Sequence, residues 1–240
     1  MESQAGEADR ILHPDRAWIR ALRLVVGGLV AAALIANTFD AAAGRGEVDL
    51  LQLYSYFTIQ SNVIFAVVLV IGALTVRSRL PRWWDGLRGA STFYLLMTGL
   101  VYVFVVAPPE EILIWNIGWT GIIEHRFAPV VALVGWVTVH MDRRSTWARP
   151  FLWLIYPLIY LGWLLLLGVI TAWYPYSFVD PTLPGGWPVV LTTIGMVTLS
   201  FIIIGVLVHL LGVLRAWASR RGLRVPARPG QQDGTVAENG

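Results

Sequence analysis

The chain has 240 residues, of which 56% are hydrophobic and only 14% are charged. Soluble domains are about 45–50% apolar and about 25% charged. This composition excludes an ordinary cytosolic enzyme, an intrinsically disordered protein and a nucleic-acid-binding protein. The formal net charge is only +3, so the positions of the charges along the chain carry more information than their sum.

Two residue types are missing from the chain. It contains no Cys, and it contains no Lys because all 18 basic residues are Arg. Without Cys there is no disulfide, thiolate nucleophile or palmitoylated anchor. Without Lys there is no Schiff base for retinal or pyridoxal phosphate. The four histidines form no metal-ligand motif, so we expect neither a cofactor nor a metal.

Six segments are long and apolar enough to cross a bilayer, which requires roughly 20 residues. They predict an all-α fold, a polytopic integral membrane bundle of six transmembrane helices. We expect a polar N-terminal arm over 1–16, a transmembrane domain over 17–214, and a basic, then polar, disordered tail over 215–240. The six predicted spans are 17–39, 54–76, 91–107, 121–141, 151–173 and 188–212.

The arginines alternate with the spans. Segments 1–23, 77–90, 142–150 and 215–240 hold 16 of the 18 arginines. The opposite connections are rich in acids instead, with Asp40, Glu47, Asp49, Glu110, Glu111 and Asp180. Because arginine-rich connections face the cytoplasm, the pattern predicts a plasma-membrane protein with both termini cytoplasmic.

Polar residues gather at the start of the second predicted span. Spacings of three and four place Ser55, Thr58, Ser61 and Asn62 on one helix face, whereas Gln60 lies on the other side. Polar side chains are costly inside a bilayer and therefore mark candidate functional sites. The alternative is packing, because hydroxyls and Asn also join transmembrane helices.

The fourth predicted span carries Glu124 and His125 at its start, and Pro129 follows four residues after the histidine. A proline inside a helix removes its own N–H and pushes away the carbonyl four residues earlier. We therefore expect a kink at His125, whose carbonyl would accept from water or from a side chain. The alternative is a charged triplet at the mouth of a helix, without further function.

Thr58 and His125 are expected at the same depth. Each lies about four residues below the outer start of its span, or roughly 6 Å at 1.5 Å per residue. The connection after the fifth span adds Tyr174, Tyr176 and Asp180 on the same side. An interfacial aromatic belt is the alternative explanation for these aromatic residues.

These motifs resemble those of the bacterial six-helix Pr6Pr membrane protein family, and the resemblance extends from the first span to the sixth. More distantly, the chain is similar to the androgen-induced membrane proteins, which include threonine hydrolases of fatty acid esters of hydroxy fatty acids. The resemblance implies that Thr58 is a nucleophile and His125 its base. The matching elements are Tyr56-Phe57-Thr58-Ile59-Gln60-Ser61-Asn62, His125 with Pro129, Tyr156-Pro157, and Tyr174-Pro175-Tyr176-x-Phe178-x-Asp180-Pro181.

The implied chemistry is that of a lipid-ester hydrolase. A threonine hydroxyl is a weak nucleophile that needs an adjacent base, and a neutral histidine can take its proton. Asn62, one turn from Thr58, is a candidate oxyanion donor. Either Glu124 or Asp180 could orient the imidazole. The remaining candidate pocket residues are Ser61, Gln60, Tyr174 and Tyr176.

A second function remains open at the same site. The protein would then be a non-enzymatic membrane transporter, sensor or assembly partner with a polar ligand cavity. In either case the expected partners are membrane lipids or a lipid-like small molecule, and no nucleic acid. A continuous polar path through the bundle would favour transport.

Overall fold

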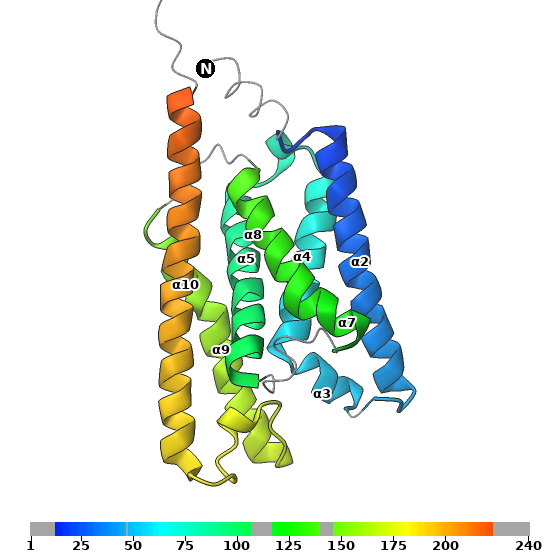
Figure 1. Ribbon diagram of the computed structural model, residues 1–240, viewed down its shortest axis with the longest axis vertical. Coiled ribbons are helices and arrows are strands. Elements are labelled where there is room, and N and C mark those ends of the chain that lie inside the picture. Colours follow the sequence, from blue (N-terminus) through cyan, green and yellow to red (C-terminus); the bar gives the residue numbers. More distant parts are fainter. Residues whose placement is uncertain (1–12, 47, 107–116, 140–145, 223–240) are drawn as a thin grey trace, which may run out of the picture.

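The protein is described here from a computed structural model that covers residues 13–46, 48–106, 117–139 and 146–222, without the side chains of 218–222. Helices running along one common direction form a bundle (Figure 1). Two segments are π-helical, η2 (Tyr102–Val106) and η3 (Ile123–Phe127). The α-helices are α2 (Ala17–Ala42), α3 (Leu50–Tyr54), α4 (Phe57–Leu74), α5 (Trp84–Val101), α7 (Gly118–Ile122), α8 (Ala128–Thr138), α9 (Arg149–Thr171) and α10 (Gly186–Gly222), with 3-10 turns η1 (Arg77–Arg79) and η4 (Ser177–Val179).

Five of these helices are long and apolar enough to cross a membrane, namely α2, α4, α5 with η2, α9 and α10. Their outward faces are apolar, with Phe104 78%, Val169 70% and Ile170 70% exposed. Apolar surface of this extent is unfavourable in water and favourable in lipid. The prediction of an all-α membrane bundle is therefore confirmed.

The fourth predicted span is helical without interruption but is not one α-helix. It consists of α7, η3 and α8 in direct succession, 21 residues from 118 to 138. The π-helical turn replaces the α-helical one immediately before Pro129. The break in α-helical hydrogen bonding therefore lies directly before the proline, and no loop interrupts the segment.

The second predicted span begins at Phe57 rather than at 54, so Ser55, which the spacing predicts on one helix face with Thr58, lies before α4 as the C-cap of α3. Two other predicted boundaries differ from the observed ones by more than three residues. α5 begins at Trp84 rather than at 91, because Asp85 is fully buried beside Arg77 and its charge does not end the helix. α10 continues to Gly222, beyond the predicted end of the domain at 214, because a helix can extend into water past its apolar part. The tail beyond 222, arm residues 1–12 and the predicted acidic positions Glu47, Glu110 and Glu111 lie outside the described residues.

α5 occupies the centre of the bundle and packs against α4, α8, α9 and α10, whereas α2 packs mainly along α4. Close packing is clearest at Gly89 of α5, where an added Cβ would lie 2.4 Å from the Trp153 ring and 2.7 Å from the Trp136 ring. The fully buried Phe93 and Leu95 lie further along the same helix. This core fixes the position of the end of α5, where the candidate site lies.

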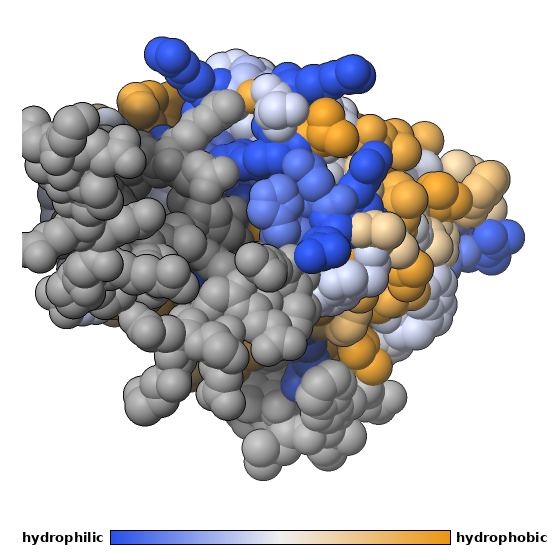
Figure 2. Space-filling model, turned by 90° about the horizontal axis from the view of Figure 1, so that it is seen from above, coloured by the Kyte–Doolittle hydropathy of each residue, from blue (hydrophilic) through white to orange (hydrophobic). Residues whose placement is uncertain are grey.

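One end of the bundle is strongly basic. The N-terminus of α2 and the C-termini of α4, α8 and α10 meet there (Figure 1), and Figure 2 views this end, where hydrophilic residues gather among hydrophobic ones. Arg20 donates to the carbonyls of Ala73 and Leu74, and Arg23 donates to that of Gly72. These arginines satisfy the last carbonyls of α4, which have no partner within the helix.

Candidate functional site: an amphipathic cavity

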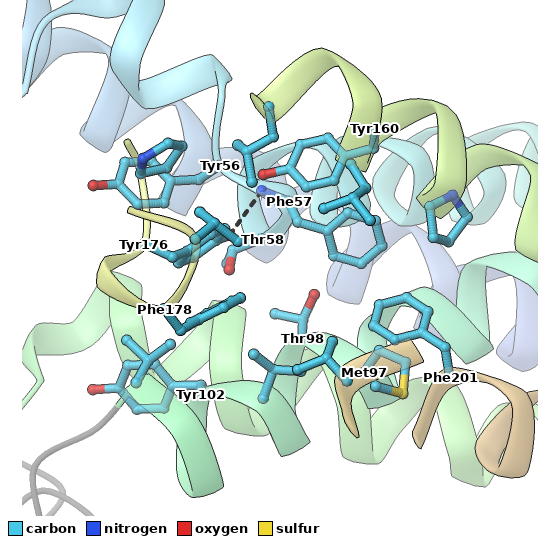
Figure 3. Close-up of a pocket in the computed structure, with 18 of the residues that line it drawn as sticks. Tyr56, Phe57, Thr58, Met97, Thr98, Tyr102, Tyr160, Tyr176, Phe178 and Phe201 are labelled. Carbon is cyan, nitrogen blue, oxygen red and sulfur yellow. Dashed lines mark hydrogen bonds between the residues drawn. The ribbon is translucent and has the colours of Figure 1, made fainter. Parts of the chain in front are cut away.

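A cavity of about 500 Å³ lies in the half of the bundle opposite the basic end. Its walls come from the start of α4, the end of α5 with η2, the π-helical segment η3, α9, α10 and the loop between the last two helices (Figure 3). One part of the wall is apolar and includes Leu158, Leu161, Leu164, Ile194 and Val197. The polar part comprises Asn37, Tyr56, Thr58, Thr98, Tyr102, Glu124, His125, Tyr160, Tyr176 and Thr198.

Thr58 lies in the first turn of α4, which begins at Phe57. The N–H groups of a first turn have no partner within the helix, and that of Phe57 donates to the Tyr176 hydroxyl over 3.0 Å. The same hydroxyl is within interaction range of the Thr58 and Tyr160 hydroxyls. The loop after α9 therefore covers Thr58, whose side chain is buried and lines the cavity.

Burial raises the pKa of Tyr176 to about 12. The phenol in this loop is therefore protonated at neutral pH and retains its O–H. Because its oxygen already accepts from the Phe57 N–H, the proton remains available to a neighbouring acceptor.

His125 lies in the π-helical segment η3. Its ring stacks on that of Tyr102, with the ring centroids 4.0 Å apart and the planes at 27°. The Nδ1 atom is buried and has no hydrogen-bond partner. The imidazole therefore reaches the cavity from between two π-helical segments, η2 and η3, with one ring nitrogen unpaired.

The π-helical register changes which carbonyl Pro129 leaves without an N–H. The Ala128 N–H donates to the Ile123 carbonyl, five residues earlier, so in this register the missing N–H of Pro129 corresponds to Glu124. Asn62 Nδ2 donates to this Glu124 carbonyl over 3.3 Å. A side chain thus satisfies a backbone acceptor in the segment before Pro129, and this acceptor is the Glu124 carbonyl.

The structure brings Thr58 and His125 to one cavity but does not join them directly. Within the described part of the chain, no hydrogen bond connects the two side chains. Neither candidate acid holds the imidazole, because the Glu124 carboxylate accepts from Asn37 Nδ2 over 2.9 Å. Asp180 accepts from the N–H and hydroxyl of Thr182 within its own turn and lies outside the cavity wall.

The remaining predicted pocket residues lie outside the cavity wall. Asn62 is fully buried, and its amide donates to the carbonyls of Thr58 and Glu124. Ser61 donates to the carbonyl of Phe57. Gln60 donates to the Tyr54 carbonyl and accepts from the Tyr156 hydroxyl, so it points away from Thr58 as the helical spacing predicts. The Tyr174 ring packs on Gly168, where an added Cβ would lie 1.9 Å from it.

Thr98 is a cavity residue that the sequence does not single out. Its hydroxyl is buried without a hydrogen-bond partner, and Figure 3 shows the hydroxyls of Thr58 and Thr98 pointing into the same space. The four-residue spacing of Tyr94, Thr98 and Tyr102 is typical of a packing face. Packing does account for Tyr94, which donates to the Trp153 carbonyl, whereas the other two line the cavity.

No group of three metal-ligating side chains occurs among residues 13–46, 48–106, 117–139 and 146–222. Comparison of the chain with family models, with curated proteins and with solved structures finds no match. The cavity and its side chains are therefore the basis on which a function can be assigned.

Proposed function

We propose that the protein is a six-span membrane protein with both termini in the cytoplasm, and that it hydrolyses a lipid ester in the outer half of the bilayer. The five long helices support the fold, and the 21 residues of α7, η3 and α8 supply a sixth crossing. At 1.5 Å per residue this crossing is about 31 Å long, the thickness of a hydrocarbon core. The arginine-rich connections support the orientation.

The cavity's two kinds of wall define the ligand class. The α9 and α10 walls carry mainly aliphatic side chains, together with Tyr160 and Thr198, and suit a hydrocarbon chain. Most of the hydroxyl, phenol and imidazole groups come from the other elements of the wall and suit an ester or a hydroxyl group. An amphipathic molecule with one polar group and at least one long chain fits both walls.

The observation that carries the hydrolase proposal is that the Thr58 hydroxyl and the unpaired imidazole of His125 line this same cavity. The more distant resemblance to the threonine hydrolases implies the same two residues as nucleophile and base. In the first step, Thr58 Oγ1 attacks the ester carbonyl while its proton passes to the imidazole, either directly or through one water. The alcohol leaves with that proton, and a water then cleaves the acyl-threonine to release the acid.

The oxyanion donors in this proposal differ from those that the sequence suggests. The Asn62 amide donates to two backbone carbonyls and is therefore unsuited to the role. The Thr98 hydroxyl has no partner, and the Tyr176 hydroxyl lies within interaction range of Thr58. Both are O–H donors on the cavity wall, and in this proposal they donate to the oxyanion in place of Asn62.

A second candidate function is non-enzymatic binding of the same class of molecule by a sensor or assembly partner. The hydrogen bond from Asn37 to the Glu124 carboxylate favours this binding function. With Glu124 engaged there, no acid orients the His125 imidazole as an acid does in hydrolytic triads. Transport is favoured less, because this cavity shares no lining residue with a second cavity, of about 290 Å³, at the basic end of the bundle.

The test is ester hydrolysis by the purified protein in detergent micelles, with long-chain esters of hydroxy fatty acids as substrates. Thr58→Ala and His125→Ala should each remove most of the activity, and the double variant should lose little more, since members of a catalytic unit are non-additive. Thr58→Ser should retain part of it. Hydrolysis that survives Thr58→Ala unchanged would contradict the proposal, and absence of hydrolysis together with saturable binding of the same esters would establish the second candidate.

A further inference from the structure

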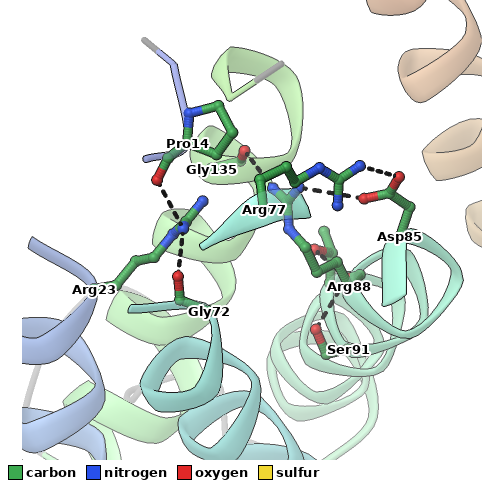
Figure 4. A network of polar contacts seen from close by, with 9 residues as sticks. Pro14, Arg23, Gly72, Arg77, Asp85, Arg88, Ser91 and Gly135 are labelled. Atoms are coloured by element: carbon green, nitrogen blue, oxygen red, sulfur yellow. Dashed lines mark hydrogen bonds and ion pairs between the residues drawn. The ribbon is translucent and has the colours of Figure 1, made fainter. Parts of the chain in front are cut away.

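A second cavity, of about 290 Å³, lies at the basic end of the bundle between α2, α4, α5 and α8. Arg23 and Arg88 line it from opposite sides, and Arg77 lies beside them (Figure 4). Arg88 interacts electrostatically with both other arginines. Guanidinium groups that repel each other in a partly buried space favour an anion between them.

The carboxylates around these arginines do not balance their charge. Asp85 is fully buried and pairs with Arg77, while Asp15 accepts from the Arg77 backbone N–H and attracts Arg23. Three guanidinium groups therefore face two carboxylates, and Arg20 adds a fourth guanidinium beside Arg23. An excess of positive charge remains at the cavity wall.

Arg88 is the guanidinium group with the weakest contacts in this cluster. Its Nη2 lies 3.5 Å from the Gly135 carbonyl, and its Nη1 lies 3.8 Å from Asp85 Oδ1. Both contacts are at or beyond the limit of a hydrogen bond. Arg23 is held more firmly, since its Nη1 donates to the Gly72 carbonyl over 2.8 Å. Arg88 thus has most of its five N–H donors to spare for a ligand.

The hydroxyl donors of this cavity are already engaged. The hydroxyls of Ser91 and Thr92 both donate to the Arg88 carbonyl, and that of Thr138 donates to the Val134 carbonyl. The charged donors that line the cavity are guanidinium groups. These bind phosphate through paired N–H donors.

The cavity is also bordered by exposed apolar side chains. Trp18 and Leu22 of α2 and Val134 of α8 are exposed at its edges. α2 contacts the fourth helical segment chiefly through α7 and η3, at the other end of the bundle. The cavity therefore lies beside a lipid-facing groove between α2 and α8.

We propose that this second cavity binds a phosphate group, and that its source is an anionic phospholipid of the inner leaflet. The phosphate lies against Arg88 and Arg23, and an acyl chain follows the groove between α2 and α8. A net-negative headgroup is preferred because of the excess positive charge. The inner-leaflet source rests on the proposed orientation, whereas the phosphate site does not depend on hydrolysis in the first cavity.

The test uses the full chain in phosphatidylcholine nanodiscs, with tryptophan fluorescence reporting the thermal midpoint. Phosphatidylglycerol titrated into the discs should raise the midpoint of the wild type. Arg88→Gln should lower the apparent affinity by about tenfold or more, whereas Arg82→Gln, an exposed arginine at the same end, should leave it within about twofold. Gly135→Leu should act like Arg88→Gln without removing a charge, because Gly135 lines the cavity and an added Cβ meets no atom within 4 Å.

Inorganic phosphate, added to phosphatidylcholine discs at matched ionic strength, distinguishes the two sources of the group. No response to inorganic phosphate supports the phospholipid. A response that Arg88→Gln abolishes keeps the phosphate site but replaces the lipid with a soluble phosphate. Equal responses of wild type and Gly135→Leu to both additions would overturn the proposal, even if Arg88→Gln failed to fold.

Discussion

The hydrogen bond between Asn62 and the Glu124 carbonyl gives a quantitative prediction about how α4 holds the histidine segment. Asn62→Leu removes the amide at a position with no exposed surface. The Thr58 carbonyl keeps its partner inside α4, so only the Glu124 carbonyl is left unpaired. A buried unpaired acceptor costs about 1–3 kcal/mol, and hydrogen bonds between membrane helices average about 0.6 and reach about 1.7 kcal/mol. We expect a loss of about 1–2 kcal/mol.

Pro129→Ala provides the second arm of a double-mutant cycle. The alanine at 129 has an N–H, which can donate to the Glu124 carbonyl if the segment stays π-helical. If the segment becomes α-helical, the Ala128 N–H donates to the Glu124 carbonyl instead. In the Pro129→Ala background, Asn62→Leu should lower the free energy of unfolding by only about 0.5 kcal/mol. The difference from its effect in the wild type, the coupling energy, is then about 1 kcal/mol. Ser61→Ala is the matched control, because its buried hydroxyl bonds only within its own helix, and it should cost less than about 0.5 kcal/mol.

The assay is equilibrium unfolding in mixed micelles, followed by tryptophan fluorescence. Additive effects of Asn62→Leu and Pro129→Ala would refute the assignment of the orphaned carbonyl to Glu124. A cost of Ser61→Ala equal to that of Asn62→Leu would show that the helix face, rather than this one bond, is responsible.

Three further predictions concern packing and topology. Gly99→Ala places a Cβ 3.1 Å from a carbonyl of η3 and should destabilise the protein by about 1–2 kcal/mol in the same unfolding assay, whereas Gly86→Ala in the same helix, with no atom within 4 Å, should be neutral or stabilising. Gly168→Ala should displace the Tyr174 ring and loosen the loop over the cavity, measured as faster proteolysis between α9 and α10; unchanged proteolysis would contradict this. A reporter after residue 215 should behave as cytoplasmic and one near Glu110 as exported, and the reverse pattern would overturn the proposed orientation.

The helical bundle is largely predictable from the sequence because burying apolar length in a bilayer is the dominant energetic requirement. The sequence predicts equal depth for Thr58 and His125, but only the packed helices show that both line one cavity, because the pattern does not specify which spans are neighbours. The packed structure was needed to show that the loop with Tyr176 covers Thr58, because loop conformation depends on long-range contacts.

The hydrogen-bond partners inside the bundle were less predictable. Pro129 indicates that a carbonyl is left without a partner, but the choice between α-helical and π-helical registers decides which one, and the sequence pattern does not distinguish these registers. The amide of Asn62 was expected in the cavity and instead bonds to that carbonyl. The arginine pattern does not indicate that Arg77 is buried beside Asp85; a paired charge can be accommodated inside a bundle.

The central claim, a nucleophilic Thr58 in the first cavity, is tested most directly by labelling with a fluorophosphonate probe in membranes. Thr98→Ala is the matched control, since its hydroxyl faces the same cavity. The wild type should be labelled covalently, Thr58→Ala should lose the label, and Thr98→Ala should keep it, at a reduced rate if its hydroxyl stabilises the oxyanion. A wild type that is not labelled, or labelling that persists in Thr58→Ala and disappears in Thr98→Ala, would contradict the claim.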